Sequence, residues 1–318
     1  MKLRGAVVGV GYLGRFHAQK IKAHADAELV GVCDYSYEQA QKVAQELSVE
    51  AFLQPQELIG KIDFVHIVAS TQAHYDLTEL FLKAKIPVLV EKPIAATVEQ
   101  ARKLCELAQQ QQTLLTVGHI ERFNPAFKFL KQYVQGASYF EMNRLAPFRI
   151  RGSDVSVLHD LTIHDIDLVN WLFQSEIVDV QVAGKKLIRP TYDDVSIRLK
   201  LANQTQVTIN NSRITSQIVR NCRLVAKDQT ILVNTATLEA EILKSTSEDP
   251  FYAVEKIQIE KQDALALEVD HFIQALKGRC PLAITAKEAT QALITIEKFV
   301  EQLDRQNQAL VNMQSGRL

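Results

Sequence analysis

The first turn of this chain constrains its fold more than any other feature. A short apolar segment, residues 3–8, runs directly into Gly9-Val10-Gly11-Tyr12-Leu13-Gly14 and then into an amphipathic segment of helical length. A buried strand that passes through such a turn into a helix is typical of a doubly wound α/β domain. Gly9 permits the tight turn, Gly11 lets a ligand approach the backbone, and Gly14 lets the helix pack closely on the strand.

The alternation of strand and helix continues to about residue 120. We expect strands at residues 3–8, 28–33, 64–68, 88–90 and 114–117, and helices at residues 13–24, 37–47, 73–83 and 98–110. The strands are apolar throughout rather than alternating, as expected for parallel strands covered on both faces. Residues 1–120 therefore predict an α/β Rossmann domain with a doubly wound parallel sheet.

The pattern changes in residues 121–318. A helix at residues 124–134, a strand at 138–148 and a helix at 155–173 precede strands at 178–186, 195–201, 206–211, 221–226, 230–233 and 257–260, and helices at 264–276 and 286–304 end the chain. Strict alternation in Val195-Ser-Ile-Arg-Leu-Lys-Leu201 indicates a sheet with one buried face. We expect a C-terminal α+β domain with a large, open, mainly antiparallel sheet that binds substrate and joins subunits into a homodimer or homotetramer.

Composition excludes several classes of partner. The formal net charge of −1 gives no general field for nucleic acid or for an acidic membrane surface. No apolar run reaches the length of a membrane span, and no leader precedes the first strand. The four cysteines, Cys33, Cys105, Cys222 and Cys280, are far apart and form no CxxC pair, which suits reduced structural thiols. We expect a cytoplasmic protein with no nucleic-acid or membrane partner and no metal.

The glycine turn also predicts the cofactor. The amides and the positive end of the following helix would stabilise a diphosphate. Asp34 ends the second strand about 20 residues beyond Gly14, where an acid accepts a hydrogen bond from the adenosine ribose. Asp34 would repel a 2′-phosphate, and Tyr35 follows it instead of an arginine, so NAD is favoured over NADP. The predicted cofactor-binding residues are Gly9, Gly11, Tyr12, Leu13, Gly14, Asp34, Ser70, Thr71, His74, Glu91 and Lys92. His74 fits a packing role in its helix equally well.

Two later motifs carry a resemblance to a known family. Val90-Glu91-Lys92-Pro93 begins at the last residue of the fourth predicted strand, and Asp160-Leu-Thr-Ile-His164 lies in the helix at residues 155–173. With the segment at residues 8–17, these motifs resemble the Gfo/Idh/MocA oxidoreductases over nearly the full chain. The resemblance implies that the protein is an NAD(P)-dependent oxidoreductase acting on CH–OH groups.

The catalytic residues implied by that resemblance are Lys92, Asp160 and His164. Asp160 and His164 stand at i and i+4, on one helical face, and a histidine has the right pKa to take a proton near neutrality. His164 would accept the alcohol proton, Asp160 would orient the substrate or the imidazole, and Lys92 would stabilise negative charge on the oxygen, with either His164 or Lys92 as the formal base. The alternative for Asp160 and His164 is an ordinary pair on a helix surface.

The polar residues around His164 are open to other readings. His159 and Asp165 suit capping or surface positions, and Asp167 fits either an approach to the site or a solvated acid. A metal site built from His159, His164 and the acids is possible by residue type, but the family resemblance argues against it.

A further segment bears on the substrate. Gly118-His-Ile-Glu-Arg-Phe-Asn-Pro125 resembles the family members that act on nucleotide sugars, in particular the UDP-N-acetylglucosamine 3-dehydrogenases. Arg122 is therefore a candidate contact for the substrate or for the nicotinamide end of the cofactor. Asn124 is a candidate substrate contact, although it also suits a helix N-cap. Arg149 and Arg151 are candidates for the diphosphate of a UDP-sugar, or else a solvated strand face. The alternatives are a dehydrogenase for inositol, another polyol or a free sugar, and a non-catalytic NAD-binding redox sensor.

Overall fold

The computed structural model describes residues 1–149, 155–247 and 252–314 of the chain. The chain divides into two compact units. The first comprises Met1–Ile120 with Asp263–Leu293, and the second comprises Glu121–Gln262 with Ile294–Leu318. The sequence analysis placed residues 263–293 with the second domain, whereas they pack into the first unit.

The first unit is built on a six-stranded sheet with the order β3-β2-β1-β4-β5-β6, in which every pair of neighbours is parallel. The strands are β1 (Leu3–Val8), β2 (Ala27–Cys33), β3 (Glu50–Phe52), β4 (Phe64–Ile67), β5 (Val88–Glu91) and β6 (Leu115–Gly118). This is the predicted doubly wound sheet, with one strand, β3, that the sequence analysis did not include. The chain reverses direction across the sheet between β1 and β4, which is where such folds bind ligands.

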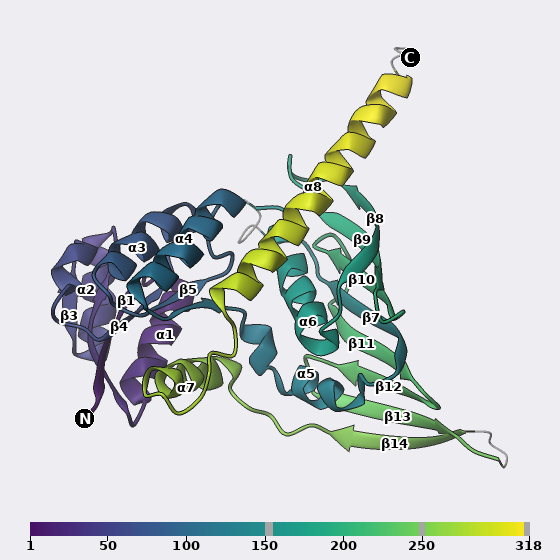
Figure 1. Cartoon of the computed structure of the whole chain (residues 1–318), viewed down its shortest axis with the longest axis horizontal. Coiled ribbons are helices and arrows are strands. Elements are labelled where there is room, and N and C mark those ends of the chain that lie inside the picture. The colour runs from purple at the N-terminus through teal and green to yellow at the C-terminus, as the bar shows by residue number, and fades with distance from the viewer. Residues whose placement is uncertain (150–154, 248–251, 315–318) are drawn as a thin grey trace. The chain divides into compact units, whose positions relative to one another are not determined.

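Helices cover both faces of this sheet (Figure 1). They are α1 (Tyr12–Ala23), α2 (Tyr37–Leu47), α3 (Thr71–Lys83), α4 (Val98–Gln111), α7 (Ala264–Leu276) and the start of α8 (Ala286–Gln314), with a short 3₁₀ turn, η1 (Pro55–Leu58). Helix α1 contacts α2 and α7, whereas α3 contacts α4. Strands are added first on one side of β1 and then on the other, and with the right-handed crossovers usual in such folds this places helices on opposite faces of the sheet.

Helix α7 joins the first unit because its apolar face completes the core there. Val269, Phe272 and Ile273 are at most 1% exposed and belong to one cluster with residues of β1, α1 and β2. The ring of Phe272 meets Phe64 edge to face at 6.0 Å between centroids. Burial of each such side chain contributes about 1.5–3 kcal/mol, which explains why α7 belongs to the core of the first unit.

The second unit contains an eight-stranded sheet with the order β14-β13-β12-β11-β7-β10-β9-β8. Its neighbours are antiparallel except β7 and β10, which run parallel. The strands are β7 (Ala137–Leu145), β8 (Ile177–Lys185), β9 (Asp194–Leu201), β10 (Gln206–Ser212), β11 (Val219–Ala226), β12 (Gln229–Asn234), β13 (Glu239–Ser245) and β14 (Tyr252–Gln258). The predicted mainly antiparallel sheet is confirmed, with β13 as an additional strand.

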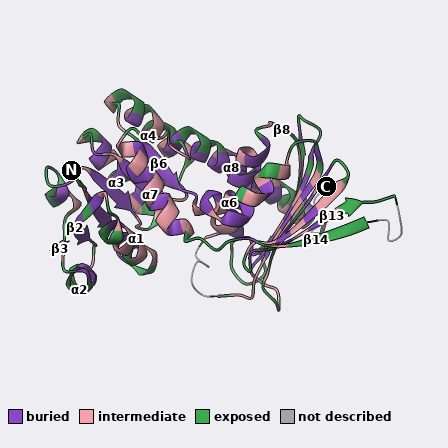
Figure 2. Ribbon diagram, turned by 90° about the horizontal axis from the view of Figure 1, so that it is seen from below, coloured by how far each residue is buried: buried purple, intermediate pink, exposed green. Residues whose placement is uncertain are grey.

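One face of this sheet is covered by helix. Val195, Ile197, Leu199 and Leu201 of β9 are buried, and the residues between them are exposed. Figure 2 shows the sheet nearly edge-on, with α6 (Ile163–Phe173) against one side and β14 largely exposed. The other elements of this unit are α5 (Pro125–Leu130), the remainder of α8, the 3₁₀ turns η2 (Ile120–Phe123) and η3 (Lys131–Tyr133), and the π-turn η4 (Leu158–Thr162). Among the described residues, no helix combines the length and the apolar character that a membrane crossing requires.

Candidate active site

The turn between β1 and α1 has the geometry that its glycines predict. Gly9 adopts a φ of +86°, and a Cβ there would lie 2.6 Å from the carbonyl oxygen of Val68. A Cβ at Gly14 would overlap the carbonyl oxygen of Gly9, whereas the space above Gly11 is open. Gly11 is the N-cap of α1, and no acidic residue stands in the helix's first turn. The backbone amides of this turn are therefore suited to an anionic diphosphate.

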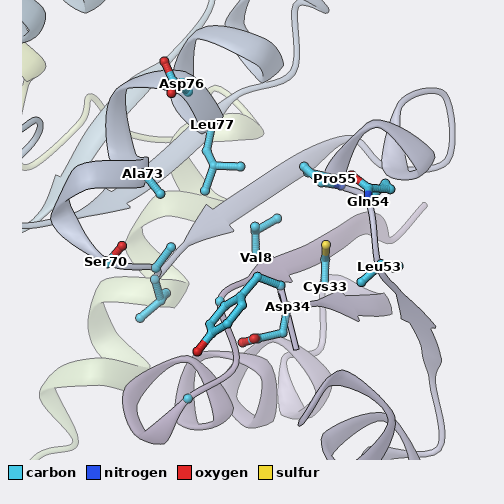
Figure 3. Close-up of a pocket in the computed structure, with 15 residues that line it drawn as sticks. Val8, Cys33, Asp34, Leu53, Gln54, Pro55, Ser70, Ala73, Asp76 and Leu77 are labelled. Atoms are coloured by element: carbon cyan, nitrogen blue, oxygen red, sulfur yellow. The ribbon is translucent and has the colours of Figure 1, made fainter. Parts of the chain in front are cut away.

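A cavity of about 630 Å³ lies over this turn, at the carboxyl ends of β1, β2 and β4. Gly9, Gly11, Asp34 and Ser70 of the predicted cofactor residues line it together. Figure 3 shows the side chain of Asp34 between Ser70 and Ala73 on one side and Leu53, Gln54 and Pro55 on the other. The volume and the mixed apolar and polar lining suit one half of a dinucleotide.

Asp34 is held in place by the backbone around it. One carboxylate oxygen accepts from the amide of Val10 at 2.8 Å, and the other accepts from the amide of Ser36 at 3.0 Å. Each carboxylate oxygen has a further lone pair, so Asp34 can still accept from a ribose hydroxyl. Beside it, burial raises the pKa of Cys33 to about 12, with a smaller contribution from Asp34, so the thiol stays neutral and serves packing.

The segment after β4 supplies a second wall. Ser70 is the N-cap of α3 and is exposed, and Thr71 begins that helix. His74 is buried, with Nδ1 at 2.7 Å from the carbonyl oxygen of Pro93 and Nε2 at 3.1 Å from that of Ala69. Burial lowers the pKa of His74 despite both carbonyls. Through these two carbonyls the imidazole links the segments that follow β4 and β5, which agrees with a packing role for His74.

Glu91 and Lys92 follow directly at the end of β5. The carboxylate of Glu91 is directed at buried His17 of α1, with Oε1 at 3.2 Å from Nε2, and its side chain is 12% exposed. Lys92 is partly exposed and precedes Pro93 through a cis peptide bond. At the start of α1, Tyr12 is 66% exposed and Leu13 is half-buried. Cofactor contacts of Tyr12, Leu13, Thr71, Glu91 and Lys92 stay predictions.

Asp160 and His164 belong to the second unit. The predicted helix at residues 155–173 is not a continuous α-helix, because Leu158–Thr162 form a π-turn that leads into α6. Asp160 lies in that turn and His164 is the second residue of α6, and both side chains are partly exposed. Single π-turns inside helices occur frequently at functional sites.

The acids that follow His164 anchor α6 in the protein interior. Asp167 accepts from Nε of Arg122 at 2.8 Å and from its terminal nitrogen at 2.6 Å, and both side chains are 2% exposed. The expectation that Asp167 is a solvated acid is therefore wrong, and its approach to the site stays a prediction. The guanidinium of Arg122, which was predicted to contact substrate, makes both of these hydrogen bonds to Asp167.

A second buried network contradicts the surface reading of Asp165. Arg144 of β7 donates to Asp165 at 2.8 Å and to Glu121 at 2.7 Å, and Asn211 of β10 donates to the other oxygen of Asp165 at 2.7 Å. Burial alone would raise the pKa of Glu121, but Arg144 outweighs it and leaves that pKa lowered. Asp165 is 1% exposed, and its bonds to Arg144 and Asn211 tie α6 to two strands of the sheet.

His159 lies in the π-turn before α6, where it pairs with Glu297 of α8 at 2.7 Å.

The other residues predicted to contact substrate are Asn124, Arg149 and Arg151. Asn124 caps α5, its side-chain oxygen accepting from the amide of Ala126 at 3.0 Å while its amide donates to Glu121 at 3.1 Å. The predicted N-cap with Pro125 in the first turn is thus confirmed. Arg149 is exposed and lies outside a strand, since β7 ends at Leu145, and its contact with a diphosphate stays a prediction. Arg151 falls outside the described residues.

Sequence reasoning missed two parts of this arrangement. One is the cavity wall formed by Leu53, Gln54 and Pro55, which follows the three-residue strand β3. The other is the pair of buried ion networks that hold α6. The only available signal for the networks was the presence of acids and arginines in otherwise apolar helix and strand segments.

Two family models match this chain. One, described as an oxidoreductase family with an NAD-binding Rossmann fold, matches residues 3–119. The other, the GFO/IDH/MocA C-terminal domain, matches residues 134–231. Together they cover more than half of the chain.

Known proteins resemble the chain over most of its length. A UDP-N-acetylglucosamine 3-dehydrogenase from Acidithiobacillus ferrooxidans is 34% identical over 94% of this chain and 97% of that protein. Its solved structure has a TM-score of 0.86 and 33% identity over the same shares. An inositol 2-dehydrogenase from Rhizobium meliloti is 29% identical over 67% of this chain and 69% of its own length. An oxidoreductase from Agrobacterium radiobacter, solved with NAD⁺, L-tartaric acid and magnesium, shares the fold with a TM-score of 0.85 at 15% identity, covering 96% of this chain and 97% of its own. The chain therefore belongs to the Gfo/Idh/MocA family, as an NAD-binding oxidoreductase that acts on hydroxyl groups.

Proposed function

We propose that this enzyme oxidises a secondary hydroxyl of a nucleotide sugar, namely the C3 hydroxyl of UDP-N-acetylglucosamine. The observation that carries the proposal is the 34% identity to a UDP-N-acetylglucosamine 3-dehydrogenase over 94% of the chain. The motif at residues 118–125, which suggested this substrate class, lies within that match. Inositol dehydrogenases are related at 27–32% identity, which makes a polyol the alternative substrate.

The proposed cofactor site follows from the first unit. The amides around Gly11 would bind the diphosphate, and Asp34 would accept from the adenosine ribose, in the cavity that both residues line. The carboxylate of Asp34 would repel a 2′-phosphate, which accounts for a preference for NAD. Bound NAD supplies the hydride acceptor.

The proposed proton chemistry uses one residue from the first unit and two from the second. Lys92 hydrogen-bonds the reacting hydroxyl and stabilises the negative charge that grows on its oxygen. His164 takes the hydroxyl proton, directly or through a relay, while Asp160 orients the sugar or the imidazole. The balanced reaction converts CH–OH and NAD⁺ into C=O, NADH and a proton. The ion networks of Asp165 and Asp167 hold the helix that carries His164.

The other proposed contacts concern the sugar nucleotide and the assembly. Arg149 and Arg151 would bind the diphosphate, and Asn124 and Arg122 would act at the sugar end only after exchange of their present partners. The sheet face opposite α6 would join two or four copies of the chain. Light scattering of the purified enzyme measures the copy number, and a monomer would overturn this part.

The deciding experiment compares substrates under identical conditions. NADH absorbance is followed with UDP-N-acetylglucosamine, UDP-glucose, N-acetylglucosamine and myo-inositol, each with NAD and with NADP. We expect the highest kcat/KM for UDP-N-acetylglucosamine with NAD. A preference for myo-inositol would establish the polyol alternative. Tight NAD binding with no turnover across the panel would instead favour a redox sensor.

A further inference from the structure

A cluster of three ionisable side chains lies inside the first unit. His17 comes from α1, Glu91 from the end of β5 and Glu268 from α7, and one side-chain ligand atom of each lies within 4.8 Å of the others. His17 is 0% exposed and Glu268 is 3% exposed. Three elements that are remote in sequence therefore direct one imidazole and two carboxyl groups at a common point.

The chemistry of this cluster is incomplete as it stands. Among the described residues, neither carboxyl oxygen of Glu268 has a hydrogen-bond partner, although both are inaccessible to solvent. Nε2 of His17 lies 3.2 Å from Glu91 but is not in hydrogen-bond orientation. A charged carboxylate is costly to bury unless a cation or a hydrogen-bond donor meets it. A positive charge between these groups would remove that cost.

The surroundings of His17 match those of a metal ligand. Its Nδ1 lies 3.0 Å from Nδ1 of buried His66, so one ring donates to the other. When His17 is the donor, its Nε2 is unprotonated and can bind a cation, and the ligand atoms of Glu91 and Glu268 lie within 4.8 Å of that of His17. Histidines that bind metals usually donate their second ring nitrogen to a neighbouring group in this way, which fixes the tautomer.

Gly118 leaves room for Glu91 to face the cluster. It pairs with Glu91 across β5 and β6, and a Cβ on Gly118 would lie 2.5 Å from Oε1 of Glu91. A larger residue would displace the carboxylate. The position of Glu91 thus depends on the absence of a side chain on the neighbouring strand.

We propose that His17, Glu91 and Glu268 bind a divalent first-row transition-metal ion that is structural and links α1, β5 and α7. Two carboxylates and a neutral imidazole carry a charge of −2, which a divalent ion neutralises. One nitrogen and two oxygen donors suit Zn²⁺, Co²⁺, Fe²⁺ or Mn²⁺, and ligand distances of about 2.0–2.2 Å fit within the spread of the three donor atoms. The sequence analysis expected no metal and did not consider these three residues together, since they stand far apart in the chain. The site is independent of the sugar substrate.

The test uses the full chain and cobalt as the probe. Wild-type enzyme is stripped with a chelator, titrated with Co²⁺ and examined by visible absorption, elemental analysis after desalting, and thermal melting. We expect about one ion per chain and a higher melting temperature with Co²⁺. Loss of second-shell partners alone costs about 10–100-fold in metal affinity, so Glu268→Gln should weaken Co²⁺ binding at least tenfold.

Glu106→Gln is the matched control, since Glu106 is exposed on α4 of the same unit. It should bind Co²⁺ as the wild type does. Circular dichroism and NAD binding verify that Glu268→Gln is folded, and if it is not, the wild-type titration decides alone. The proposal is overturned if stripped wild type gains neither a stoichiometric ion nor stability with Co²⁺, Zn²⁺ or Mn²⁺. A Glu268→Gln protein that melts no lower than untreated wild type, with unchanged Co²⁺ uptake, would also overturn it and identify Glu268 as a protonated acid.

Discussion

The buried pair between Arg122 and Asp167 gives a quantitative test of how α6 is held. Asp167→Asn preserves the shape of the side chain but removes its charge, so the cost is electrostatic and not that of a cavity. Both side chains are 2% exposed and share two hydrogen bonds of 2.8 and 2.6 Å. The guanidinium of Arg122 would remain charged in an apolar setting.

The magnitude follows from that burial. Removal of one partner from a buried ion pair costs about 3–5 kcal/mol. A change of 1 kcal/mol shifts the melting temperature of a domain of this size by about 2–4 °C, so the variant should melt about 6–20 °C lower. Differential scanning calorimetry measures the transition of the second unit directly.

The control is Glu301→Gln in the same unit. Glu301 pairs with Arg305 one turn away on α8, with side chains 64% and 80% exposed. Exposed pairs of this kind contribute little, so the expected shift is within about 2 °C. A loss of less than about 2 °C in Asp167→Asn, equal to the control, would refute the assignment of Arg122 and Asp167 as the anchor of α6.

Four further substitutions test the site. Lys92→Ala and His164→Ala should each slow hydride transfer by at least about 10²-fold in single-turnover absorbance, with NAD affinity by fluorescence nearly unchanged; wild-type turnover in either variant would remove that residue from the mechanism. Asp34→Ala should lower the preference for NAD over NADP in kcat/KM, because it removes the charge that opposes a 2′-phosphate, and an unaltered ratio would contradict this role. Gly14→Ala should weaken NAD binding and cost about 1–3 kcal/mol of stability, since its Cβ would overlap the carbonyl of Gly9; a variant with normal affinity and melting would show that the turn tolerates a side chain.

The local elements could be predicted well from the sequence. The apolar runs and the glycine turn identify most strands and helices of the first unit, because parallel strands buried on both faces have few polar residues. Strand β3 escaped notice because its three residues include exposed Glu50. Strand β13 escaped because charged residues interrupt its apolar ones.

The tertiary contacts could not be predicted in the same way. Helix α7 packs in the first unit because its apolar face fits against Phe64, about 200 residues away in the sequence. No local sequence pattern predicts that contact. In the sequence, Asp165 and Asp167 look like ordinary polar helix residues. Their burial could not be predicted, because it depends on ion pairs with Arg144 and Arg122, which are distant in the chain. At the site, the glycines and Asp34 predicted where the cofactor cavity lies. Its wall at residues 53–55 could not be predicted, because these residues follow β3, the strand that the sequence analysis missed.

The central claim is that hydride leaves C3 of UDP-N-acetylglucosamine for NAD. The direct measurement is turnover of UDP-N-acetylglucosamine deuterated at C3, with mass spectrometry of the nicotinamide product. We predict that the deuterium appears in the reduced cofactor and that turnover slows relative to the unlabelled sugar. Reduced cofactor without deuterium, or no reduction with this substrate while myo-inositol is oxidised, would contradict the account.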